Sequence, residues 1–110
     1  RIEVAPEVLT TIAQFATLRV EGVSKLVSAS SSKTRFSRHS THQNGILLDL
    51  SDEKVIFDIH IMMDPHVNIM ETSRTVQKAV IEAIDTMVGI PVNAVNIHVE
   101  DVVYAQSEVA

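Results

Sequence analysis

The chain has 110 residues, 45% hydrophobic and 21% charged, a balance typical of a folded domain rather than a disordered segment. It contains no cysteine, which excludes disulfides, thiolate metal sites and a cysteine nucleophile. Its net charge of −5 disfavours general nucleic-acid binding, because neutralisation of phosphates supplies most non-specific affinity. We expect a single domain over residues 1–110.

The first predicted element is a helix from Pro6 to Glu21. Proline suits the first turn of a helix, and Gly22 suits the position just after its end. Apolar residues recur in this segment at spacings of three and four, as they do on the buried side of an amphipathic helix. The predicted buried stripe consists of Val8, Ile12, Phe15, Ala16 and Val20.

A short strand is expected over residues 23–28, and a long polar loop follows at about residues 29–44. The loop is rich in serine and threonine and has no apolar periodicity, which is typical of an exposed connection. From Gly22 to Leu48 there is no Asp or Glu, so the loop has a local excess of positive charge. The candidate residues for contact with an anionic partner are Lys33, Arg35, Phe36 and Arg38.

Two strands with alternating apolar residues are predicted next, over residues 46–50 and 55–63. The polar turn at residues 51–54 joins them, so they form an antiparallel hairpin. Alternate residues of the second strand are expected to point toward the helices. These residues are Val55, Phe57, Ile59, Ile61 and Met63.

A second helix is predicted after the hairpin. Asn68 followed by Glu71 three residues later has the form of a capping box, with Asn in the place of Ser or Thr. Gly89 and Pro91 end the helical pattern. The predicted buried stripe of this helix consists of Ile69, Ser73, Val76, Val80, Ile84 and Met87.

A final strand is predicted over residues 95–99, and its alternation breaks after Glu100 and Asp101, which indicates a bulge. A long helix with short connections links the hairpin to this strand, so we expect the second hairpin strand and the final strand to be parallel. The predicted fold class is α+β, with elements in the order α-β-β-β-α-β. Both helices are expected to pack on one face of a small mixed β-sheet, as a two-layer sandwich.

Four stretches of the chain form a pattern through their order and spacing: residues 2–8 leading into Ile12-Ala13, residues 20–23, residues 76–80 and residues 92–99. This pattern resembles that of the alkaline-shock (envelope stress response) protein family of Gram-positive bacteria. The resemblance implies a general stress protein linked to the cell envelope, cytoplasmic and in some members held at the membrane by a partner. It also implies no established catalytic activity and supplies no catalytic residues to transfer.

Candidate catalytic or metal-binding groups are scarce in the sequence. The serines and histidines of the polar loop have no rigid frame, and the chain contains neither a G-x-S-x-G elbow nor a glycine-rich phosphate loop. His60 shares a strand face with Asp58, and His98 shares one with Glu100, so the four side chains meet if the two strands are neighbours. They are then candidates for a metal site or an enzyme, but outward polar alternation on a half-buried strand explains them more simply. We favour the second interpretation and expect no enzyme activity, no metal and no cofactor.

The outward face of the sheet is the predicted interaction surface. If Phe57 and its alternates face the helices, then Ile56 and Met62, with Leu47 on the partner strand, face away from them. Mixed apolar and polar exposure of this kind marks interaction surfaces. The candidate interface is therefore Leu47, Ile56 and Met62, and we expect a homo-oligomer formed through this face or through a sheet edge.

The predicted function is that of a non-catalytic, self-associating scaffold or interaction module in cell-envelope homeostasis. A membrane-anchored protein is a candidate partner that would hold the chain at the membrane periphery. Direct membrane insertion is not expected, because no apolar run approaches the roughly 18–20 residues needed to cross a bilayer.

The alternative function is a nucleic-acid-binding regulator that uses the basic loop at residues 33–38. Affinity for RNA or DNA would then fall steeply with salt, and replacing Lys33, Arg35 and Arg38 with Gln would abolish it. A gel-shift titration at low salt measures this affinity, with Lys54→Gln, outside the loop, as the charge control. No binding at low salt would contradict the alternative.

Overall fold

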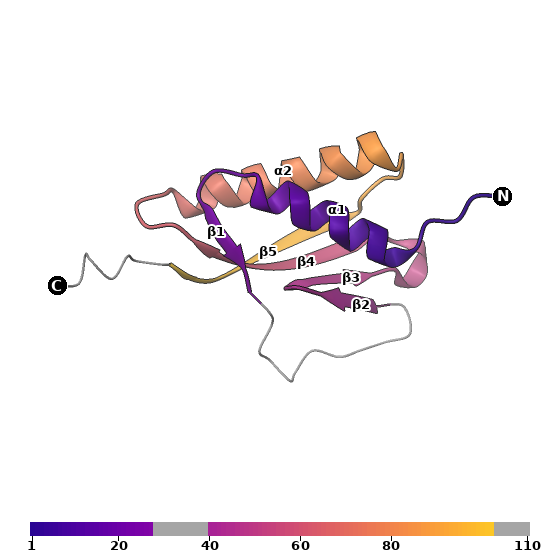
Figure 1. Ribbon diagram of the computed structural model, residues 1–110, viewed down its shortest axis with the longest axis horizontal. Helices are drawn as coiled ribbons and strands as arrows, with labels where there is room; N and C mark the ends of the chain where they lie inside the picture. Colours follow the sequence, from indigo (N-terminus) through magenta and orange to yellow (C-terminus); the bar gives the residue numbers. More distant parts are fainter. Residues whose placement is uncertain (28–39, 103–110) are drawn as a thin grey trace.

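The computed structural model describes residues 1–27 and 40–102, which form two helices on one face of a five-stranded sheet (Figure 1). The predicted α+β class and the predicted order of elements are confirmed, with one additional short strand. The helices are α1 (Pro6–Leu18) and α2 (Ile69–Met87). The strands are β1 (Val23–Leu26), β2 (Ser40–Gln43), β3 (Ile46–Asp49), β4 (Ile56–Met63) and β5 (Ala94–Val102), and a short 3₁₀ helix, η1 (Ser51–Glu53), joins β3 to β4.

The central strand is β4, because three other strands pair with it. β5 runs parallel to β4 along one edge, with Phe57 beside Val95 and His60 beside His98. On the opposite edge, β3 pairs antiparallel with the first half of β4 and β1 pairs antiparallel with the second half. β2 extends the sheet beyond β3. The parallel pairing predicted for β4 and β5 is therefore confirmed.

The hydrophobic core lies between β4 and the two helices. Burial alternates along β4, so that every second side chain is completely removed from solvent, as expected for a strand with one covered face. Each such side chain contributes about 1.5–3 kcal/mol through its burial. The fully buried residues of β4 and α2 are Phe57, Ile59, Ile61, Met63, Val76, Val80 and Ile84, all of which were predicted to face the core.

Two polar contacts hold α2 in place. The backbone N–H of Glu71 donates to Oδ1 of Asn68 at 2.9 Å, which confirms the predicted start of the helix. Farther along, Nε2 of Gln77 donates to the carbonyl oxygen of Val95 at 2.8 Å and ties the helix to β5. The helix is thus anchored both at its first turn and to the strand that it covers.

The buried side of α1 differs from the predicted stripe. The helix ends at Leu18, and its buried apolar residues include Leu9 and Ala13, whereas Val8 is 45% exposed and Phe15 is 66% exposed. Apolar residues occur around most of α1, so their spacing is compatible with more than one buried side. At the end of α2, Met87 is 69% exposed instead of buried.

The segment predicted as a loop at residues 29–44 contains the strand β2 at its C-terminal end. The Ser-Thr-His-Gln sequence of this strand has no apolar alternation, so only its backbone pairing with β3 defines it. The candidate anionic-partner residues Lys33, Arg35, Phe36 and Arg38 lie outside the described residues.

β4 changes partner at His60, and this junction depends on a glycine. The N–H of His60 donates to the carbonyl of Gly45, and its own carbonyl accepts from the N–H of Val27, both at 2.9 Å. Gly45 has a φ of +85°, and a Cβ placed there would lie 2.5 Å from the carbonyl oxygen of Val27. Only glycine fits where β1 and β3 meet beside β4.

We predict that Gly45→Ala lowers the free energy of unfolding by about 3 kcal/mol or more, since it adds a backbone clash to the cost of positive φ. Gly89→Ala is the matched control, because Gly89 has a φ of +81° and no atom within 4 Å of the new Cβ. The control should lose only about 1–2 kcal/mol. Urea unfolding measures both values, and equal losses would contradict the close approach of Val27 to Gly45.

Candidate functional site

The predicted interface residues lie on the face of the sheet opposite to the helices, and all three are half-buried. Leu47 is paired with Asp58 in the β3–β4 ladder, which places it diagonally beside Ile56. Met62 lies about 20 Å from Ile56 along β4, beside Lys25 of β1. The structure therefore brings Leu47 and Ile56 together but leaves Met62 at the other end of the face.

A quartet of imidazoles and carboxylates fills the space between these apolar ends. His60 and His98 lie side by side in the β4–β5 ladder, with ring centroids 4.5 Å apart and planes inclined by 14°. Nδ1 of His60 lies 2.7 Å from Oε2 of Glu100, and Nε2 of His98 lies 2.9 Å from Oδ1 of Asp58. The approach of these four side chains, which the sequence predicted for neighbouring strands, is confirmed.

A bulge in β5 accompanies the His60–Glu100 contact. Ile61 lies beside Val99, but the next pair is Met62 with Asp101, so Glu100 is an extra residue on β5. Bulges redirect the side chains at which they occur. The bulge predicted at this point is confirmed. Its extra residue, Glu100, is the one whose carboxylate contacts His60.

The two contacts determine which ring nitrogen carries the hydrogen in each neutral imidazole. A carboxylate oxygen only accepts hydrogen bonds, so the donors are Nδ1–H of His60 and Nε2–H of His98. The other nitrogen of each ring then presents a lone pair.

The quartet does not have the geometry of a metal site. Ring lone pairs lie in the ring plane, and in two nearly parallel stacked rings they do not converge on one ion. Within residues 1–27 and 40–102, no group of three or more His, Cys, Asp or Glu side chains is arranged to hold a metal. Contacts between these partly exposed groups contribute at most about 1 kcal/mol each to stability.

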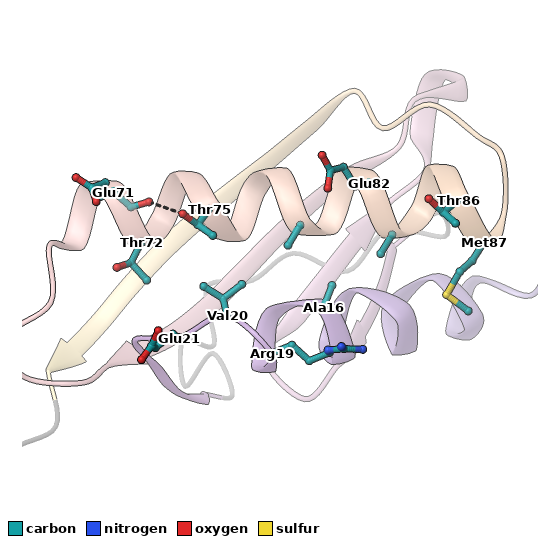
Figure 2. Close-up of a pocket in the computed structure, with 12 residues that line it drawn as sticks. Ala16, Arg19, Val20, Glu21, Glu71, Thr72, Thr75, Glu82, Thr86 and Met87 are labelled. Carbon is teal, nitrogen blue, oxygen red and sulfur yellow. Dashed lines mark hydrogen bonds between the residues drawn. The ribbon is translucent and has the colours of Figure 1, made fainter.

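The helical face of the molecule contains a groove that the sequence did not predict. A hollow of about 760 Å³ lies between α1 and α2, with Ala16 of α1 and Val20, just after the end of α1, directed toward α2 (Figure 2). Glu21 and Glu71 lie at one end, and Met87 reaches from the last turn of α2 toward α1 at the other end (Figure 2).

A smaller apolar hollow of about 380 Å³ shares Met87 with the first and continues it along α1. Its lining includes the exposed side chains of Val8 and Phe15. We refer to the two hollows together as the helical groove. The excess of apolar residues on α1, more than one buried side requires, was the signal in the sequence that could have revealed it.

Comparison with known proteins finds one family model that matches residues 1–104, and this model describes the alkaline shock protein family, with a cell envelope-related function. The uncharacterized protein Spy1535 of Streptococcus pyogenes serotype M6 is 34% identical over 102 residues, covering 93% of this chain and 78% of its own length. The uncharacterized protein YqhY of Bacillus subtilis is 29% identical over 101 residues, covering 90% of this chain and 74% of its own length. No solved structure matches the chain.

Neither α1 nor α2, the helices of the described residues, combines the length and the apolar character that a membrane-crossing helix needs.

We predict opposite tautomers for the two neutral histidines, with the proton on Nδ1 in His60 and on Nε2 in His98. Long-range ¹H–¹⁵N correlation spectra at alkaline pH report this directly. Glu100→Ala should remove the Nδ1–H preference of His60 and leave His98 unchanged, while Asp58→Ala should affect only His98. The same tautomer in both rings of the unmodified protein would contradict the arrangement.

Proposed function

The chain belongs to the alkaline shock protein family, which has a cell envelope-related function, and from this premise we propose that it is a non-catalytic, self-associating interaction module. Its role is to link proteins in cell-envelope homeostasis by means of its surfaces.

The uncovered face of the sheet carries this proposal. Both described helices lie on one side of the sheet, so the outward side chains of β3, β4 and β5 have no described layer above them (Figure 1). Leu47, Ile56 and Met62 supply apolar contact area there. The quartet between them would fix how two copies align along the strands. In a copy shifted along the strands, apolar side chains would lie against the carboxylates of the quartet.

A non-catalytic role agrees with the chemistry of the described surfaces. His60 and His98 line neither of the two hollows of the helical groove, and the quartet lies on the open face of the sheet. The groove itself is lined by carboxylates, threonines, apolar side chains and Arg19, without a histidine or lysine to serve as a base for a hydroxyl nucleophile. These features support binding rather than covalent chemistry.

The cell envelope-related function of the family supports a place of action at the envelope. We propose that the chain works on the cytoplasmic side of the envelope, peripheral to the membrane, through a membrane-anchored protein partner. Support for this proposal comes from the cell envelope-related function of the family.

Met62→Lys is expected to weaken self-association by about tenfold or more, because it places a charge in the contact area of a second copy. Leu47→Lys should act in the same direction from a different strand. Sedimentation velocity at micromolar concentration measures the oligomeric state.

Ile81→Lys is the matched control for these variants, since Ile81 is 41% exposed on α2, on the opposite side of the molecule. It should leave self-association unchanged. A monomeric unmodified protein, or an equal effect of Ile81→Lys, would count against an interface on the outer sheet face.

A further inference from the structure

The helical groove has apolar anchors that a monomer leaves in water. Phe15 is 66% exposed, Met87 is 69% exposed and Val8 is 45% exposed, and all three line the smaller hollow. Aromatic residues and methionine are enriched in protein interfaces, and methionine adapts its shape to different partners. This end of the groove is therefore suited to receive large apolar side chains.

The remainder of the groove has the shape to accommodate a helix. Its walls are the facing sides of α1 and α2, which pack against each other and run in opposite directions (Figure 1), and its lining includes the small side chains of Ala16, Ala79 and Ala83. Small side chains allow the axis of a third helix to approach the axes of α1 and α2 to about 8–10 Å, the usual distance between packed helices. α1 has 13 residues and is about 20 Å long, so a partner helix of about the same length would fill the groove.

The charge of the lining selects the kind of helix. Four carboxylates and one guanidinium line the two hollows, which leaves the groove with three net negative charges. Basic residues flanking the apolar stripe of a partner helix would lie near these carboxylates, and acidic ones would be repelled. The charged residues are Glu7, Glu21, Glu71, Glu82 and Arg19.

We propose that the helical groove binds a basic amphipathic helix of a partner protein, with apolar residues of that helix seated on Phe15 and Met87 and its basic residues beside the acidic rim. This inference deepens the proposed function, on which it rests, by naming the chemistry of the partner segment. It concerns the face opposite to the one assigned to self-association, so either assignment can fail without the other.

The first experiment tests the chemistry of the ligand. The probe is a fluorescein-labelled peptide of about 18 residues, or five helical turns, made of Leu and Lys with one apolar face. Fluorescence anisotropy should show saturable binding to the full chain. A Leu/Glu peptide of the same pattern, and a Leu/Lys peptide scrambled to remove the apolar face, should each bind at least about tenfold more weakly.

Two pairs of matched variants then test the site. Glu82→Lys should weaken binding about threefold to tenfold, whereas Asp85→Lys, with the same charge change on the same helix but outside the groove, should change it less than about twofold. Met87→Ser combined with Phe15→Ser should weaken binding about tenfold or more, and Ile81→Ser should not. Circular dichroism checks that each variant is folded.

Three results would overturn the proposal. Equal binding of the Leu/Glu peptide would remove the role of charge, and equal loss in Asp85→Lys and Glu82→Lys would show attraction to the whole chain instead of the groove. If Phe15→Ser with Met87→Ser abolishes self-association while Met62→Lys preserves it, the occupant is a second copy. That last result would also contradict self-association through the outer sheet face. Failure of peptide binding alone would not affect that assignment.

Discussion

The pairing of β4 with its neighbours is the constraint on which the rest of the structure depends. β4 is held along its whole length by β5 on one edge and by β3 and β1 in succession on the other. With both edges paired, its side chains can point only toward the helices or away from them. Complete burial of the inward set then requires both helices on the same side, which leaves the other side of the sheet without a helical layer.

Two different surfaces result from this one-sided arrangement. On the outer sheet face every second side chain of each strand points outward, so the side chains lie in rows. The pairing of His60 with His98 places the quartet at the centre of this face. The helical face follows the spacing of two antiparallel helices, so it is grooved, and its charge comes from residues at the helix ends and along the rim. A flat surface suits contact with another sheet, whereas a groove suits a helix.

Several elements were predictable because their signals are local. The alternation in residues 55–63 and the Asn68–Glu71 cap depend on neighbours within a few positions, and the structure contains both. The quartet was predictable only conditionally, since two strands had to be neighbours before His60 and His98 could meet. The helical groove was missed because the spacing of apolar residues on α1 is compatible with several orientations, and the predicted stripe included Val8 and Phe15, which the fold leaves exposed.

By itself the sequence determined the fold class, the parallel crossover, the inward face of β4 and the absence of thiol chemistry, because each depends on composition or on short-range periodicity. Only the tertiary structure decided which side of α1 is buried, that Ser40–Gln43 pairs as a strand, and that the imidazoles stack instead of converging. The physical reason is that these three features depend on contacts between segments distant in the chain. The helix α1 has apolar residues on most sides, so the elements that it packs against determine its orientation. The polar strand β2 is held only by backbone hydrogen bonds, so its pairing partner determines its position.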